Sequence, residues 1–132
     1  MIYAVIDTNV IVSALLSHNP GAATVQVFGA IFENKICPLF NEDIISEYID
    51  VLNRPKFRLP SQMVEAVVHK LKDIGLHSHR VQSMETFPDL DDAVFYEVAL
   101  SKEDAYLVTG NTKHFPKICD VARNFVDLHG MD

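Results

Sequence analysis

Residues 2–9 of the chain read IYAVIDTN, a run of five apolar residues that passes directly into three polar ones. An uninterrupted apolar run that is rich in β-branched and aromatic side chains predicts a buried strand from Ile2 to Ile6. Strands without polar alternation are typical of parallel sheets that helices cover on both faces. Asp7 follows the last strand residue, so the same stretch also indicates where a polar site would lie.

Strands and helices alternate along the rest of the chain. Apolar residues at steps of three and four predict helices near residues 10–16, 22–33, 41–54, 59–75 and 90–102, the first of them capped by Thr8 or Asn9. Short apolar runs predict strands at 36–39, within 76–87 and at 105–108, which looks like a central strand, and one more is possible beyond residue 118. This alternation predicts one α/β domain over residues 1–132, with three α/β/α layers and a mostly parallel sheet of four to five strands.

The composition fits an ordinary globular protein. The 132 residues are 48% hydrophobic and 22% charged, which is enough for one domain with a buried core. No apolar stretch reaches the roughly 18 residues of a membrane span, and no basic segment precedes the first apolar run, so neither a membrane location nor a secretory signal is expected. Cys37 and Cys119 lack metal-site spacing. Reduced thiols in a cytoplasmic protein are the expectation.

The balance of charge is acidic. Eighteen acidic residues against eleven basic ones give a formal net charge of −7. Broad electrostatic attraction to nucleic acid is therefore not expected. A nuclease is still compatible with this charge when the excess acids hold divalent cations, because bound metal ions reverse the local field.

Candidate site residues follow from the rule that open parallel sheets bind ligands at the carboxyl ends of their strands. Asp7 follows the first strand, and Thr109 and Asn111 follow the strand at 105–108. A carboxylate placed directly after a buried strand needs a partner, such as a metal ion or hydrogen-bond donors. An N-cap role at the following helix explains Asp7 equally well.

The remaining acids have ordinary explanations when each is taken alone. Glu47 lies in mid-helix on one stripe with Asp43 and Asp50, as on a solvated helix face. Asp91 and Asp92 lie in the first turn of a predicted helix, where acids complement the helix dipole. Taken together, these carboxylates with Asn and Thr oxygens form a hard donor set suited to Mg²⁺ or Mn²⁺. Such a site activates water for attack on a phosphodiester.

Four segments in order resemble the PIN domain family. The first is VIDTNV at residues 5–10, and the second is SEY at 46–48 with VLNRPKF at 51–57. The third is DLDD at 89–92 followed by Phe95, Glu97 and Ala99, and the fourth is YLVTGN at 106–111 followed by HFP at 114–116. Within the family, the chain is most similar to VapC-like toxin components of toxin–antitoxin pairs. Residues 121–125 match the family's closing strand only loosely.

The resemblance implies a function and a site. It implies a metal-dependent (Mg²⁺ or Mn²⁺) endoribonuclease with an RNA substrate, a small antitoxin protein as partner, and a homodimer. Asp7, Glu47 and Asp92 would be the metal-site acids, with Asp92 preferred over Asp91 because Ala99 follows it by seven residues. Asn111 would complete the cluster at a position that is often Asp, and Asn9, Thr109 and Asp91 would support it.

Two other classes of protein stay open. A non-catalytic PIN module that binds a protein or RNA would be consistent with Asn111 and with the acidic charge. A phosphatase or a receiver domain also places Asp after its first strand. The phosphatases want a second Asp where this chain has Asn9, and Lys113 is an imperfect match to the receiver lysine. Nucleotide-binding glycine motifs are absent from the sequence, and His77 and His79 lack a third zinc ligand nearby.

Overall fold

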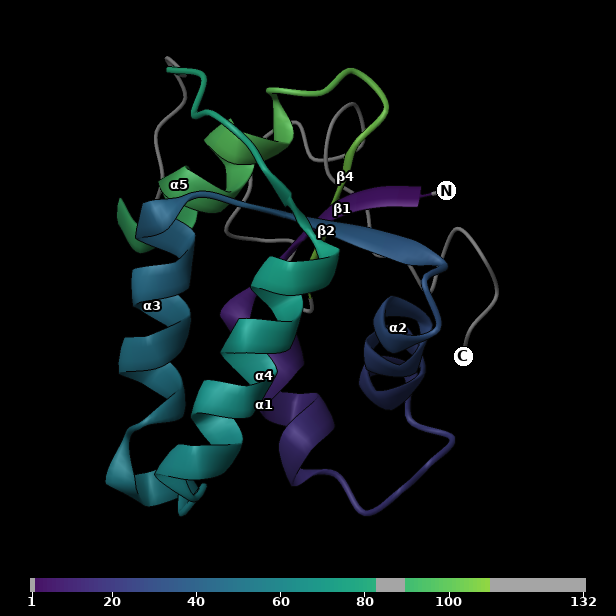
Figure 1. Cartoon of the computed structure of the whole chain (residues 1–132), viewed down its shortest axis with the longest axis vertical. Coiled ribbons are helices and arrows are strands. Elements are labelled where there is room, and N and C mark those ends of the chain that lie inside the picture. The colour runs from purple at the N-terminus through teal and green to yellow at the C-terminus, as the bar shows by residue number, and fades with distance from the viewer. Residues whose placement is uncertain (1, 83–89, 110–132) are drawn as a thin grey trace.

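The computed structural model describes residues 2–82 and 90–109, with the backbone alone for residues 90–92. Its elements, in chain order, are β1 (Ile2–Ile6), α1 (Thr8–Leu16), α2 (Ala23–Phe32), β2 (Ile36–Phe40), α3 (Glu42–Leu52), the short 3₁₀ helix η1 (Pro55–Phe57), α4 (Ser61–Ile74), β3 (Leu76–His77), α5 (Leu90–Ala99) and β4 (Tyr106–Val108) (Figure 1). The alternation of strands and helices predicted from the sequence is confirmed.

The four described strands form one parallel sheet in the order β3-β2-β1-β4. β1 pairs with β2 on one side, where Ile2 lies opposite Ile36, and with β4 on the other, where Ile6 lies opposite Val108. Because β1 is enclosed by two strands and by helices, its last three residues, 4–6, are almost fully buried. This position explains why the run in residues 2–6 has no polar alternation.

The helices cover both faces of the sheet. The chain moves across the sheet from β1 to β2 to β3 and then returns to β4 on the far side of β1. Because crossovers between parallel strands are right-handed, this reversal places the helices of the first crossovers on one face and α5 on the other. Figure 1 shows α1, α2 and α4 together on one side of the strands and α5 on the opposite side. The α/β fold and its mostly parallel sheet are thus confirmed.

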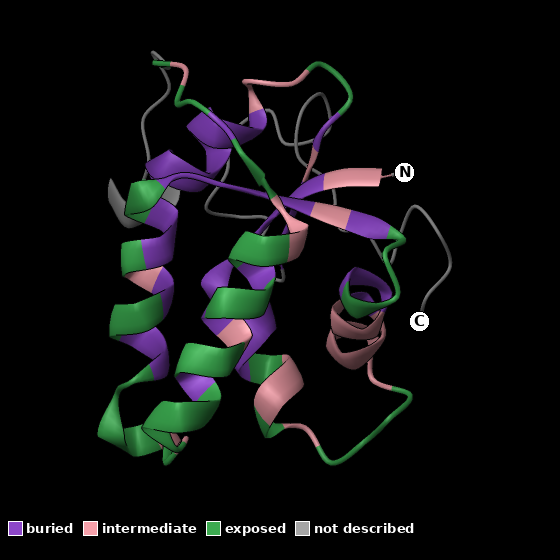
Figure 2. Cartoon of the chain, in the orientation of Figure 1, coloured by how far each residue is buried: buried purple, intermediate pink, exposed green. Residues whose placement is uncertain are grey.

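Each helix buries one face or more against the sheet. In α3 and α4 the buried residues recur at helical spacing, and the outer faces are exposed (Figure 2). In α5 every described side chain, from Ala93 to Ala99, is buried, including that of Glu97. A helix that is buried on all sides is expected to be apolar throughout, so the carboxylate of Glu97 requires a specific partner.

Several local predictions are corrected. The cap of α1 is Asp7, while Thr8 and Asn9 lie inside the helix. The last predicted helix ends at Ala99 rather than Lys102, because residues 100–104 turn the chain toward β4. Among the described strands β4 pairs with β1 and stands at the end of the sheet order, so the expectation of a central strand at 105–108 depends on residues outside the described ranges. The possible strand beyond residue 118 falls outside the described residues.

Two expectations from composition can be compared with the described residues. Each helix in the described ranges is too short or too polar to cross a membrane. Cys37 is a half-buried free thiol on β2, and Cys119 lies outside the described residues.

Candidate active site

The candidate site lies where the direction of the chain across the sheet reverses. Helices that follow neighbouring strands on the two sides of such a point lie on opposite faces, which opens a crevice beyond the carboxyl ends of the strands. Here the reversal falls between β1 and β4. Asp7 is the first residue after β1, and Thr109 is the first after β4.

Asp7 is buried and is held by groups from both sides of this point. Its Oδ2 accepts a 2.7 Å hydrogen bond from the hydroxyl of Thr109, a residue 102 positions away. Its Oδ1 accepts the N–H of Asn9 at 3.5 Å, the cap bond of α1, and its own N–H donates to Val108. The bond to Thr109 has the usual length for a hydroxyl donor, and the cap bond is at the limit for a hydrogen bond. Capping is therefore real but weak, and it does not account for burying a carboxylate here.

Tyr48 links α3 to this end of β1. Its buried hydroxyl donates to the carbonyl of Ile6, the residue before Asp7. Burial raises the pKa of Tyr48 above its ordinary value, and the negative charge of Asp7 raises it further. The hydrogen bond to Ile6 places the middle of α3 beside the end of β1. The ring of Phe95 on α5 lies 6.2 Å from that of Tyr48, so α5 approaches the same place.

Glu47 precedes Tyr48 and differs from the other acids on its stripe. Its side chain is half-buried, whereas those of Asp43 and Asp50 are exposed. Asp50 forms a 3.4 Å ion pair with Arg54, as expected on a solvated helix face. That explanation holds for Asp50 and does not extend to Glu47.

The other predicted residues are placed only in part. Asp91 and Asp92 lie in the first turn of α5, and their side chains are outside the described part of the chain, as is all of Asn111. Asn9 has an exposed side chain and contacts Asp7 through its backbone N–H. The described residues thus bring together Asp7 and Thr109, with Glu47 on the adjoining turn of α3.

The groups around Asp7 have the chemistry of a hard-metal site. Carboxylate and hydroxyl oxygens are the donors that Mg²⁺ and Mn²⁺ prefer. The hydroxyl of Thr8, next to Asp7, is buried and has no hydrogen-bond partner among the described residues. An unsatisfied buried hydroxyl beside a buried carboxylate fits a site that accepts a further polar group. Among the described side chains, those of residues 2–82 and 93–109, no cluster of three or more His, Cys, Asp or Glu residues could hold a metal ion.

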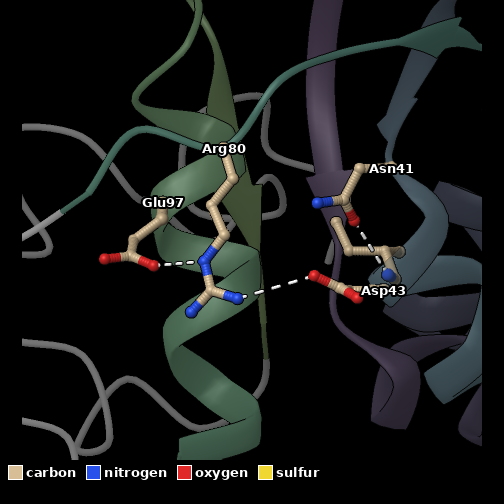
Figure 3. Close-up of polar contacts among 5 residues, drawn as sticks. Asn41, Asp43, Arg80 and Glu97 are labelled. Atoms are coloured by element: carbon tan, nitrogen blue, oxygen red, sulfur yellow. Dashed lines mark hydrogen bonds and ion pairs between the residues drawn. The ribbon is translucent and has the colours of Figure 1, made fainter.

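Two residues near the carboxyl ends of the strands were not predicted as part of a site. Asn41 follows β2, is buried, and caps α3 by accepting the N–H of Ile44 at 2.9 Å. The rule that selected Asp7 would also have selected Asn41. Arg80 follows β3 and contacts Asp43 and Glu97 (Figure 3). No sequence pattern marks Arg80, because residues 76–87 have no clear periodicity.

Comparison with known proteins supports one family. The family model described as "PIN domain" matches residues 3–113, which is most of the 132-residue chain. No curated protein matches the sequence. The matched range includes β1 and β4, and the chain reverses its direction across the sheet between these two strands. We call this place the switch point. The range also includes α3 and α5, which approach it.

Proposed function

Because this chain belongs to the PIN domain family, whose members are generally nucleases, we propose that it is a Mg²⁺- or Mn²⁺-dependent endoribonuclease. The observation that carries the proposal is the buried carboxylate of Asp7 at the switch point, fixed by the hydroxyl of Thr109. A buried carboxylate at the ligand-binding edge of a parallel sheet is costly, and a cation there offsets the cost.

We assign the roles as follows. Asp7, Glu47 and Asp92 would hold the metal ion, and Asn111 would complete the cluster. A divalent metal bound there would supply an activated water and charge stabilisation for hydrolysis of an RNA phosphodiester. Thr109 fixes the orientation of the Asp7 carboxylate through Oδ2, and the N–H of Asn9 contacts Oδ1. Asp91 supports the cluster, and a carboxylate of the site accepts the proton of the attacking water.

The biological setting in this proposal comes from the sequence resemblance. We propose a VapC-like toxin that acts in the cytoplasm, forms a homodimer and is neutralised by a small antitoxin protein. The net charge of −7 is consistent with a basic partner, because opposite net charges favour association. A short reading frame for such a protein beside the gene would support this setting.

The test of the enzymatic proposal replaces Asp7 with Asn. Asp7→Asn removes the charge and keeps a residue that caps helices well, so the fold should persist. Loss of an acid that binds the metal directly should reduce Mn²⁺-dependent RNA cleavage by about 100-fold or more. Loss of a group that only orients a metal ligand already reduces metal affinity or activity by roughly 10–100-fold. Cleavage of a labelled RNA measures the activity, and circular dichroism shows whether the fold persists.

Asp50→Asn is the matched control, because it makes the same chemical change at an exposed acid paired with Arg54. Its cleavage should equal that of the unmodified protein. If Asp7→Asn cleaves RNA as fast as Asp50→Asn, the proposed role of Asp7 is wrong.

A second candidate function is a catalytically inactive PIN module that binds a protein or RNA. Two features favour it: Asn111 stands where an acid is common, and the net charge is acidic. A Mn²⁺ titration without binding, together with no cleavage of any RNA tested, would favour this candidate over the nuclease.

A further inference from the structure

Glu97 introduces a charge into a helix that is otherwise packed on all sides. Among the described side chains of α5, all buried, it is the one carboxylate. Its Oε1 accepts a hydrogen bond from Nε of Arg80. Breaking a buried ion pair is far more costly than losing an exposed one. Arg80 is therefore an ion-pair partner that stabilises the packed position of α5.

Arg80 also connects α5 to α3. Its Nη1 lies 3.6 Å from Oδ2 of Asp43 in the first turn of α3. Figure 3 shows the guanidinium between Glu97 on one side and Asp43 on the other. The neighbouring Val81 donates its N–H to the carbonyl of Glu97 at 3.0 Å, so the backbone after β3 is attached to α5 as well.

The two contacts differ in strength. The side chain of Asp43 is 65% exposed, so its 3.6 Å ion pair with Arg80 contributes little by itself. The side chain of Glu97 is 8% exposed, so its pair with Arg80 is the anchor. Only a planar guanidinium offers donors in two fixed directions at once, one toward each helix. A lysine could hold one of these partners, but not both in the same geometry.

The helices joined by Arg80 are those that carry two of the proposed metal-site acids. Asp43 lies one helical turn before Glu47 on α3, and Glu97 lies on the same helix as Asp92. Carboxylates gathered around one site repel each other when no metal is bound, which tends to separate the helices that carry them. The positively charged guanidinium of Arg80, which lies between α3 and α5, opposes that separation.

We propose that Arg80 is a positioning residue of the metal site. Anchored by Glu97, it sets the spacing of α3 and α5 and thereby the spacing of Glu47 and Asp92. This inference rests on the proposed function, because it assigns those two acids to the metal. Arg80 acts through the helices and does not itself contact the metal or the RNA.

The experiment compares Arg80→Met, Arg80→Lys and Glu97→Gln in the full-length protein. Three quantities are measured: the Mn²⁺ dissociation constant by calorimetry, the melting temperature without metal, and kcat and KM for RNA cleavage. Arg80→Met should weaken Mn²⁺ binding by about 10–100-fold, the range typical of groups that orient metal ligands. It should also lower kcat and leave KM for RNA unchanged. Arg80→Lys should recover part of the Mn²⁺ affinity, because it keeps the charge and loses the planar fork.

Lys35→Met is the matched control. Lys35 forms an exposed ion pair with Glu33 at 3.1 Å and lies just before β2, at the amino end of the sheet. The variant removes the same charge far from the proposed site, and its Mn²⁺ affinity should equal that of the unmodified protein. A purely structural role of Arg80 would lower the melting temperature without changing the Mn²⁺ dissociation constant of the folded protein.

The outcomes separate this inference from the proposed function. If the unmodified protein binds Mn²⁺ and cleaves RNA while Arg80→Met binds Mn²⁺ equally well, the inference alone is overturned. If Arg80→Met changes only KM for RNA, the inference is overturned as well, because Arg80 then contacts the substrate. If Arg80→Met does not fold, the Mn²⁺ titrations of Arg80→Lys and Glu97→Gln test the inference in its place. An unmodified protein that neither binds Mn²⁺ nor cleaves RNA overturns the proposed function and this inference with it.

Discussion

At the scale of the residue, Asp7 combines two roles that are often treated as alternatives. One carboxylate oxygen caps α1 at 3.5 Å, and the other accepts a 2.7 Å bond from Thr109. A cap on a surface helix normally faces water, whereas Asp7 is buried. The N–H groups of the first helical turn and the hydroxyl of Thr109 both favour the charged carboxylate. The two contacts thus fix the orientation of the carboxylate.

Tyr48 provides a residue-scale test of this end of β1. Tyr48→Phe removes the hydrogen bond to the carbonyl of Ile6 and should lower the free energy of unfolding by about 1 kcal/mol at neutral pH. Urea denaturation measures the change. Tyr3→Phe, which removes the hydroxyl of a half-buried tyrosine near the other end of β1, is the control.

The same variant gives a prediction for pH. The pKa of Tyr48 is raised above its ordinary value of 10, first by burial and then by the charge of Asp7. The folded state therefore keeps the phenol proton where the unfolded state loses it. Stability is unaffected below pH 10 and falls above it, by up to about 1.4 kcal/mol per pH unit from this group. Tyr48→Phe should lack this part of the decrease in the free energy of unfolding above pH 10. Parallel stability curves for the two proteins above pH 10 would contradict the assignment.

At the scale of the element, Gly75 shows why α4 ends where it does. Glycine after a helix usually supplies a left-handed backbone, but Gly75 is extended, with φ −88° and ψ −176°. A Cβ there would lie 2.4 Å from the carbonyl oxygen of Pro38 on β2 and 2.6 Å from that of Leu71. Glycine is required because α4 passes onto β3 in direct contact with the backbone of β2.

Two glycine variants should therefore have opposite effects on stability. Gly75→Ala should destabilise the protein by about 1–3 kcal/mol, because backbone atoms have to shift to make room. Gly29→Ala should stabilise it by about 0.5–1 kcal/mol, since Gly29 lies inside α2 with nothing within 4 Å of an added Cβ. Urea denaturation compares the two. A Gly75→Ala protein as stable as Gly29→Ala would show that the contact with Pro38 is not tight.

At the scale of the whole molecule, the proposed metal site predicts that metal binding affects stability as well as catalysis. Mn²⁺ at about 100 times its dissociation constant should stabilise the fold by about 2.7 kcal/mol, because it binds the native state alone. The melting temperature should rise by several degrees, and chelation should reverse the rise. Asp7→Asn should lose the effect, and Asp50→Asn should retain it. An equal rise in Asp7→Asn would place the metal elsewhere.

The amino-acid sequence determined the features that depend on local periodicity. The apolar run at residues 2–6, the alternation of strands and helices, and the position of Asp7 after a strand were all predictable, because burial imposes a repeat of its own on each element. The four ordered segments that resemble the PIN domain family identified the family by their residues and their order, and the match over residues 3–113 confirms it. Sequence periodicity could not distinguish Glu47 from Asp50 on one helical stripe, because both positions carry the same pattern.

Only the tertiary structure decided which distant residues meet. The bond between Thr109 and Asp7 joins residues 102 positions apart, and it exists because β4 returns to the far side of β1. The contact of Arg80 with Glu97 depends on how the segment after β3 crosses α5. No local repeat encodes such pairs. They follow from the order of the strands and the packing of the helices, and that order brings Thr109 to the buried carboxylate of Asp7.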